Sequence, residues 1–341
     1  MPKDNENVGL PLFEPPDKAE SIGFPPEQMI RCEECLRANP PTRIACFYCS
    51  AALPLEPGSL ELRKLSLRPP GKNELGFNVI IAPTEYVSNE LPLNDVASLL
   101  KLSAETVQSI LRARKALPLA RTASLEEAGL LVERLAALGV ESRLLSDDEL
   151  GSVTTGVIRV RVIGFDDECP SFLHSGGTEK TMFEWPGLKL IVTGRLVTRT
   201  VEVRERKLRK EENEILSTSE FFTDEPVIDL YLNSDMRTWR IPGNGFDFSC
   251  LGSKKGLLAH ENLRTLLSQL TEKAPAAIRV ADYDYNRKIL DQVWTMDQQT
   301  QSRGWKRDSP GKYSISGETI ECNESQFTRY SKLQSYFSET L

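Results

Sequence analysis

Four cysteines in two close pairs constrain the fold of this chain more than any other feature of its sequence. The stretch "CEECLRANPPTRIACFYC" has the spacing C-x2-C-x10-C-x2-C. Each pair can place two thiolates on one tight turn, and two such turns that face each other offer four sulfurs in a tetrahedron. The spacing therefore predicts these metal ligands: Cys32, Cys35, Cys46 and Cys49.

Zinc is the metal that fits this pattern best, because it accepts four thiolates at about 2.3 Å and has no strong geometric preference of its own. A segment this short buries too little surface to fold alone, so metal binding must supply most of its folding energy. No histidine lies near it in the sequence, which makes the site all-cysteine and closed. We predict one structural Zn²⁺, with an iron–sulfur centre or free thiols as the alternatives.

The N-terminal sequence and the lack of long apolar runs indicate in which cellular compartment the protein is expected. The start "MPKDNENVGLPLFEPPDKAE" has charges and prolines where a signal peptide has an apolar core. No apolar run approaches the roughly 18–20 residues that span a bilayer. We expect no transmembrane segment and a reducing, cytoplasmic location, where clustered cysteines indicate a metal site. Buried or half-buried thiols are expected for Cys169, Cys250 and Cys322.

The length of 341 residues favours two to three domains. The formal net charge of -7 argues against a broad electrostatic hold on nucleic acid. The patterns predict a multi-domain α+β fold: a small zinc ribbon, a compact β-α-α-β-α-β domain, and an antiparallel β domain with a C-terminal helix. The expected parts are a disordered lead (1–27), the zinc finger (28–52), a linker (53–73), the α/β domain (74–150), the antiparallel β plus helix domain (156–300), and a C-terminal strand and helix docked on it (301–341).

A regular pattern of strands and helices begins at Phe77. "FNVIIA" predicts a strand, and two short helices follow, the second capped by Ser103. After the strand "ALPLAR", Ser124 and Glu127 predict a capping box before a longer helix. Gly139 should end that helix, and "VESRLLS" predicts the last strand of the segment.

Longer strands are expected beyond residue 156. "LKLIVTGRLVTRTVEVRER" predicts two strands with a bend at Gly194, and "NSD" predicts a hairpin turn. An apolar stripe then indicates a helix that ends at Pro275. Its members are Leu263, Leu266, Leu267 and Leu270. A C-terminal helix should dock through Phe327, Tyr330 and Leu333.

No motif for catalysis is evident in the sequence. His174 and His260 stand alone and are expected as exposed polar positions, and no nucleophile or phosphate-binding motif surrounds them. The clusters "SDDEL" and "FDDEC" could gather a divalent cation, but solvated loops explain them more simply. "RTVEVRERKLRKEENE" mixes both signs of charge, which is typical of a solvent-exposed ribbon. These observations favour a non-enzymatic protein.

The cysteine module resembles the Ran-binding-protein-type zinc finger, written C-x2-C-x3-N-x6-C-x2-C, and a plain bacterial zinc ribbon describes it equally well. The resemblance implies a structural or ligand-contacting role for Asn39. Ile30 stands where that family has a tryptophan, and Leu36-Arg37 stands where its ubiquitin-binding members have a Thr-Phe-like pair. Neither ubiquitin nor RNA is therefore implied by the motif itself. The positions that fit are Cys32, Cys35, Asn39, Cys46 and Cys49.

The segment "LLKLSAETVQSILRARKALPLARTASLEEAGLLVERLAALGVESRLL" resembles the C-terminal domain of the bacterial ribosomal stalk protein, whose fold also serves the adaptor of the Clp protease. The resemblance implies that fold. The stalk family's Gly-Leu-Lys surface is replaced here by "KLSAETVQ", so factor binding is not implied. The strands and helix that follow resemble, in outline, a pleckstrin-homology-like domain.

Two functional classes remain at this stage. The favoured one is a non-enzymatic intracellular zinc-binding adaptor or scaffold with an unidentified protein partner. The alternative is a single-stranded RNA-binding protein that acts through the finger, where charge and stacking groups are available. Those groups are Arg31, Arg37, Arg43, Phe47 and Tyr48.

Overall fold

The computed structural model divides the chain into two compact units, Met1–Lys64 and Leu65–Leu341. Its strands and helices form a mixed α+β architecture, which confirms the predicted fold class at that level. The predicted disordered lead and linker lie largely outside the described residues, as do Cys169 and the centre of the mixed-charge run. The structure describes residues 23–54, 65, 67–71, 74–83, 91–166, 170–174, 176–177, 179–206, 214–309 and 312–338.

The first unit contains the finger, by which we mean residues 23–54. Its regular elements are a 3-10 turn η1 (Pro26–Gln28) and the antiparallel strands β1 (Ile30–Arg31) and β2 (Ala38–Asn39). An isolated bridge joins Ala45 to Ala52. A core this small cannot hold a fold without a further link between its parts. Its buried hydrophobic residues are Ile30, Cys32, Cys46 and Leu53.

The second unit begins with the α/β segment, which has the predicted order of elements. The central strand β3 lies between β4 and β5 and is antiparallel to both. Its elements are β3 (Phe77–Ile81), α1 (Leu93–Leu100), α2 (Ala104–Ala113), β4 (Leu117–Thr122), α3 (Leu125–Ala137) and β5 (Ser142–Ser146).

Local capping in this segment agrees with the sequence in part. The Ser103 hydroxyl accepts a 3.1 Å hydrogen bond from a backbone N–H of α2, and Gly139 has the left-handed φ of 81° that ends α3. The Ser124 hydroxyl likewise accepts from the Glu127 N–H at 3.2 Å. The Glu127 carboxylate, however, accepts from the Leu67 N–H at 2.7 Å. The predicted capping box is therefore only half formed. The Glu127 carboxylate accepts from the backbone of residue 67 and not from the Ser124 N–H.

The "SDDEL" cluster is a helix and not the solvated loop we predicted. Helix α4 (Asp147–Ser152) begins there. The Ser146 hydroxyl accepts from the Glu149 N–H at 3.1 Å, while the Glu149 carboxylate accepts from the Ser146 N–H at 2.7 Å. This reciprocal pair is a complete capping box. The Asp147 carboxylate is paired with Arg121, so it is already occupied within the fold.

The remaining strands form one nine-stranded sheet in the order β13-β14-β9-β10-β11-β6-β7-β8, with β12 also paired to β9. Most neighbours are antiparallel, but β6 with β11 and β12 with β9 are parallel. The predicted antiparallel sheet is thus corrected to a mixed one. Parallel neighbours need long connections, and here whole strands or helices separate each parallel pair along the chain. The strands are β6 (Gly156–Gly164), β7 (Ser171–His174), β8 (Lys180–Met182), β9 (Leu188–Arg206), β10 (Glu214–Leu232), β11 (Asp235–Pro242), β12 (Ile278–Val280), β13 (Asp297–Ser309) and β14 (Lys312–Cys322).

Residues 188–206 form the single strand β9, which passes through Gly194 without a break, so the prediction of two strands here is wrong. A Cβ atom at Gly194 would lie 2.6 Å from Cε2 of Phe327 and 2.8 Å from Cδ1 of Tyr283. The glycine therefore allows two aromatic rings to lie against the strand backbone.

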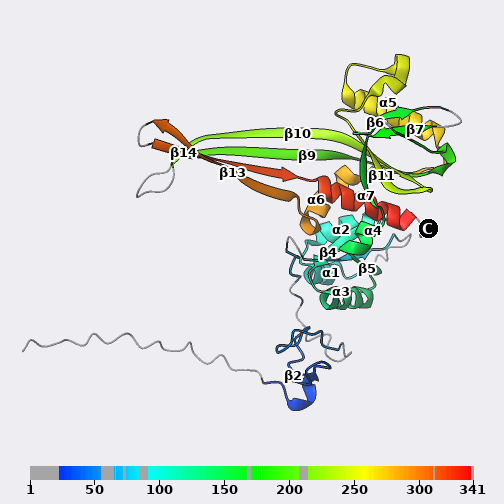
Figure 1. Cartoon of the computed structure of the whole chain (residues 1–341). Coiled ribbons are helices and arrows are strands. Elements are labelled where there is room, and N and C mark those ends of the chain that lie inside the picture. The colour runs from blue at the N-terminus through cyan, green and yellow to red at the C-terminus, as the bar shows by residue number, and fades with distance from the viewer. Residues whose placement is uncertain are drawn as a thin grey trace, which may run out of the picture. The chain divides into compact units, whose positions relative to one another are not determined.

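Helices cover both faces of the inner half of the sheet. Leu190 and Val192 of β9 belong to a core that also contains buried residues of α6, α7 and the α/β segment, whereas Ile191 belongs to a second core with α5. The α/β segment and the sheet thus share one core (Figure 1). In the described part of the chain, no helix has the length and apolarity to cross a membrane. The helices are α5 (Ala259–Lys273), α6 (Tyr283–Val293) and α7 (Glu324–Ser338), with a 3-10 helix η3 (Trp185–Gly187) before β9 and another, η4 (Phe248–Lys254), before α5.

The two predicted apolar stripes are buried as expected. Leu263, Leu266 and Leu270 of α5 lie in the second core, and Leu267 is partly buried against it. The three residues through which the C-terminal helix α7 was expected to dock have no measurable exposure. These are Phe327, Tyr330 and Leu333.

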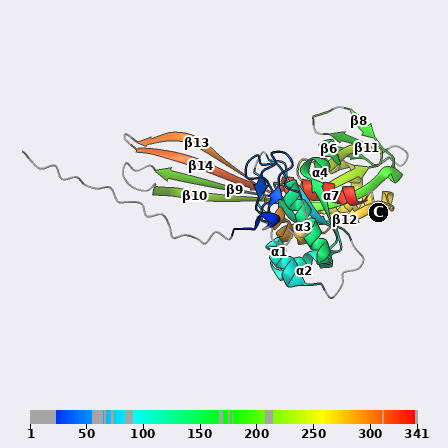
Figure 2. The same cartoon turned by 90° about the horizontal axis from the view of Figure 1, so that it is seen from below.

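Four strands continue past the helices as a ribbon (Figures 1 and 2). Every residue of β9 from Thr198 to Arg206 is half-exposed, although successive side chains point to opposite faces. Neither face of β9 is therefore fully buried along this stretch. We call the ribbon the arm, made of residues 198–206, 214–226, 297–309 and 312–322.

Candidate metal centre

The first cysteine pair of the finger lies on a tight backbone turn. The Leu36 N–H donates to the Cys32 carbonyl at 2.9 Å, and the Cys32 N–H donates to the Arg37 carbonyl at 3.0 Å. Leu36 has a φ of 59°, which lies in the left-handed region that L-residues other than glycine seldom adopt. Pairing of β1 with β2 closes the turn. The turn brings both thiols of the pair to one side.

The second cysteine pair forms the same turn, with Cys46 in the place of Cys32 and Cys49 in the place of Cys35. The Ser50 N–H donates to the Cys46 carbonyl at 3.0 Å, and the Cys46 N–H donates to the Ala51 carbonyl at 2.7 Å. Ser50 has a φ of 60°, matching the residue after the first pair. The bridge from Ala45 to Ala52 in the second turn is equivalent to the pairing of Arg31 in β1 with Ala38 in β2 in the first turn. The finger is thus two copies of one turn, "IRCEECLRAN" and "IACFYCSAAL", a repeat we did not predict.

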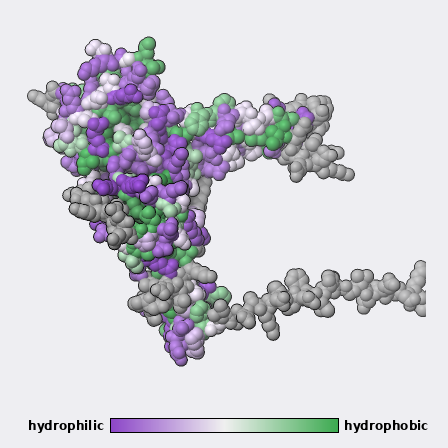
Figure 3. All heavy atoms as spheres, turned by 180° about the vertical axis from the view of Figure 1, so that it is seen from behind, coloured by the Kyte–Doolittle hydropathy of each residue, from purple (hydrophilic) through white to green (hydrophobic). Residues whose placement is uncertain are grey.

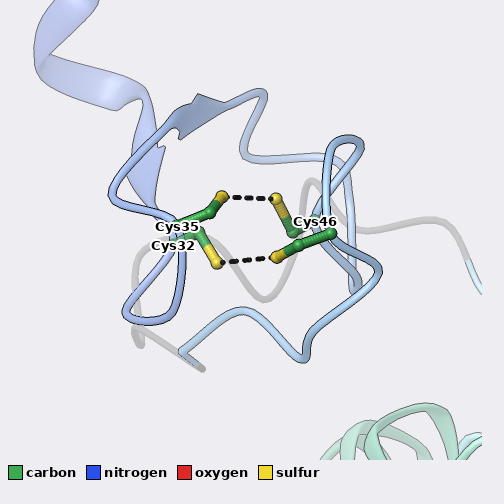
Figure 4. A group of neighbouring side chains, drawn as sticks. Cys32, Cys35 and Cys46 are labelled. Carbon is green, nitrogen blue, oxygen red and sulfur yellow. Dashed lines mark hydrogen bonds between the residues drawn. The ribbon is translucent and has the colours of Figure 1, made fainter.

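The two turns face each other and bring all four predicted ligands together (Figure 4). The sulfur atoms of Cys32 and Cys49 are 3.6 Å apart, and those of Cys35 and Cys46 are 3.5 Å apart. All four sulfurs lie within 4.8 Å of one another. A tetrahedral ion with bonds of about 2.3 Å to sulfur requires edges of about 3.8 Å. The arrangement can therefore hold one metal ion.

Asn39 joins the two turns next to the sulfurs. Its side chain is fully buried. The amide nitrogen donates to the Arg37 carbonyl at 2.9 Å and to the Cys46 sulfur at 3.4 Å, and the amide oxygen accepts from the Phe47 N–H at 2.8 Å. Groups that hydrogen-bond to metal ligands fix their orientation and charge. Asn39 is thus a structural residue of the site, in line with the role implied by the resemblance.

The environment of Cys46 favours its thiolate form. Burial raises the pKa of this thiol, but backbone N–H groups of Cys49 and Tyr48, the neighbouring thiol and the Asn39 amide together lower it to about 6. A thiolate is the form that binds metal. The neighbours of Cys46 thus favour the form of this thiol that binds a cation.

Aromatic side chains lie on the outer surface of the finger. Phe47 is 68% exposed and Tyr48 is 53% exposed, although both stand between two metal-ligand positions. The guanidinium of Arg37 lies 4.6 Å from the Tyr48 ring centre, and that of Arg43 lies 5.1 Å from the Phe47 ring centre. Neither ring contributes to the finger's core. The second turn therefore carries two cation–aromatic pairs at its surface.

The other candidate residues from the sequence lie in the second unit. Cys250 and Cys322 are half-buried, as expected, and burial raises the pKa of the Cys250 thiol to about 11. His260 is exposed near the start of α5. His174 is half-buried and ends strand β7, so its predicted exposed position is wrong.

Comparison with protein-family models, with curated proteins and with solved structures found no match for this chain. The assignment of the metal centre therefore rests on the geometry and chemistry of its own residues.

Proposed function

We propose that this chain is a non-enzymatic, cytoplasmic adaptor that carries one structural zinc ion and binds another protein along an open strand of its arm. Zinc is the proposed metal because four thiolates in a tetrahedron suit it best. With all four positions taken by sulfur, none is left for a substrate or a catalytic water. The zinc is then a folding element, and binding is assigned to the surfaces around it.

The open edge of strand β10 is the observation that carries the adaptor proposal. From Glu214 to Pro226 this strand is paired with β9 on one side, and its pairing with β11 begins only at Val227. In the described part of the chain, its other side makes no backbone hydrogen bond from Glu214 to Glu225, and the Pro226 carbonyl accepts from the Gly243 N–H at 2.8 Å. An exposed strand edge is a template for pairing with a further strand.

Two neighbouring aromatic residues give this edge apolar contact surface. Phe221 is 56% exposed and Phe222 is 63% exposed, and they point to opposite faces of the arm. Hydrophobic atoms are visible on the arm among hydrophilic ones (Figure 3). Exposed aromatic residues on an unpaired edge are costly in a protein that remains alone, which favours a strand-adding protein partner.

The test is affinity capture from native cell extract with the full chain and with a Phe221→Ser/Phe222→Ser variant. We expect a partner that is retained by the wild-type chain and lost with the variant, while the thermal transition changes little. Met236→Ser is the control, since Met236 is 61% exposed on a different strand. The adaptor proposal fails if the double variant captures the same proteins as the wild-type chain.

Single-stranded RNA is a second candidate ligand, supported by the cation–aromatic pairs on the finger. Exposed rings can stack on bases while nearby guanidinium groups contact phosphates. Binding of mixed single-stranded RNA, followed by fluorescence anisotropy, should weaken steeply with added salt. Phe47→Ala should weaken it further, and Tyr285→Ala, which removes an exposed ring elsewhere, should not. RNA binding that is unchanged both by added salt and by Phe47→Ala would argue against this candidate.

A further inference from the structure

A cavity of about 490 Å³ lies in the second unit, between α4 and one face of α7. Residues of β6, β11 and β13 complete its lining. The part of α7 that lines it includes Ser325, Arg329 and Lys332. A cavity of this size suits a small molecule, since ligand pockets generally fall between about 300 and 1,000 Å³.

Several charges in the lining are already neutralised by partners in the fold. Asp147 is paired with Arg121. Arg240 is bound by both oxygens of Asp229, at 2.7 and 2.9 Å, and it also contacts Glu324 at 3.1 Å. These groups have little remaining capacity for a ligand.

Two cations in the same lining have no carboxylate partner. Arg329 is half-buried, and in the described part of the chain its guanidinium makes no hydrogen bond or ion pair. The Lys332 ammonium donates to the carbonyls of Gly151 and Thr154, at 2.7 and 3.3 Å. The exposed carboxylate of Asp297 also lines the cavity, but it lies outside ion-pair distance of either cation. Asp147 and Asp297 therefore act on Arg329 only through their nearby charge, and no carboxylate is in direct contact with either cation.

The surroundings disfavour these charges in the absence of a counter-ion. Burial lowers the pKa of Arg329 and the nearby charge of Arg121 lowers it further, while the charges of Asp147 and Asp297 only partly oppose this. Burial also lowers the pKa of Lys332. The Ser325 hydroxyl is shielded from solvent and has no hydrogen-bond partner. A half-buried cation that lacks a partner and an orphaned hydroxyl on the same helix are together typical of a site for an oxyanion.

We propose that this cavity binds the phosphate group of a small molecule, with Arg329 and Lys332 supplying the positive charge. The planar guanidinium of Arg329 can donate two parallel hydrogen bonds to phosphate oxygens, and the Lys332 ammonium adds a point charge. The cavity is larger than a phosphate ion, which leaves room for the rest of a phosphorylated metabolite. All residues of the site belong to the second unit, and none of them lies on strand β10.

Isothermal titration of the full chain with inorganic phosphate, and separately with ribose 5-phosphate, in a chloride buffer tests the proposal. We expect saturable binding at one site per chain. Tighter binding of the ester identifies a phosphorylated metabolite as the ligand class, and equal binding identifies phosphate itself. Arg329→Gln should weaken binding by about tenfold or more, since it removes a charge-assisted pair of hydrogen bonds. Arg112→Gln, at an exposed arginine of α2, is the matched control and should bind like the wild-type chain.

Stability measurements separate a ligand site from a structural role. In phosphate-free buffer, Arg329→Gln should have a urea midpoint equal to or above that of the wild-type chain, because it removes a half-buried charge without a partner. Added phosphate should then raise the wild-type midpoint and leave that of the variant unchanged. The proposal is overturned if neither probe binds saturably, if the variant binds as well as the wild-type chain, or if the variant loses stability in phosphate-free buffer.

Discussion

The indole nitrogen of Trp294 donates a 2.8 Å hydrogen bond to the side-chain oxygen of Asn78, a residue that precedes it by 216 positions. Both side chains are fully buried. The Asn78 amide in turn donates to the Leu145 carbonyl at 3.2 Å and to Asp147 at 3.0 Å. The end of α6 is thereby joined to the α/β segment by a buried polar link. This link helps to explain why residues 65–341 form one compact unit.

Trp294→Phe should lower the free energy of unfolding by about 1–3 kcal/mol, because it leaves the buried Asn78 oxygen without a donor. Urea denaturation followed by circular dichroism would measure the loss. Tyr285→Phe is the control, since Tyr285 lies on α6, which Trp294 directly follows, and is 89% exposed, so its effect should stay within about 0.5 kcal/mol. Equal effects of the two substitutions would contradict the importance of this link.

Gly194→Ala should destabilise the second unit by about 1–3 kcal/mol, because the added methyl group would collide with the rings of Tyr283 and Phe327. Gly317→Ala on strand β14 is a matched control, because a Cβ atom there meets nothing within 4 Å. Thermal denaturation of both variants would make the comparison. A Gly194→Ala protein as stable as the Gly317→Ala protein would show that the aromatic rings can move aside at no cost.

Metal analysis of chain purified without chelator should find about one zinc per chain, as four ligands in one tetrahedron require. Cys46→Ser should lose that zinc, while Cys250→Ser, which changes a half-buried thiol in the other unit, should keep it. Chelation should unfold the finger alone, because no finger residue belongs to the two large cores. Loss of the main cooperative transition on chelation would refute this independence.

Asn39→Ala should weaken zinc binding by about 10–100-fold, because the amide holds the Cys46 sulfur and the Phe47 N–H together. Competition with a chromogenic chelator would measure the affinity. The control is Glu34→Gln, an exposed position between the first two ligands that should bind zinc like the wild-type finger. Unchanged affinity in Asn39→Ala would mean that backbone hydrogen bonds alone orient the sulfurs.

Features that depend on a few neighbouring residues were predictable from the sequence. The metal ligands follow from the cysteine spacing, the cap at Ser103 from the hydroxyl before an apolar helix, and the end of α3 from Gly139. The order of elements in the α/β segment was predictable for the same reason. The helix at "SDDEL" could also have been predicted, because Ser146 and Glu149 have capping-box spacing. We interpreted its acidic residues by charge alone.

By itself, the sequence determined the paired metal-binding turns and the stripes that become buried, because each depends on interactions over one or two turns of chain. Only the tertiary structure decided three other features. These are the packing of aromatic rings against Gly194, the hydrogen bond from the Leu67 N–H to Glu127, and the place of Arg329 and Lys332 in the cavity beside α7. Each of these depends on a partner that the chain brings near from tens to hundreds of positions away. The local propensities of a sequence carry no information about such distant partners. Their positions follow from how two cores pack on opposite faces of one sheet.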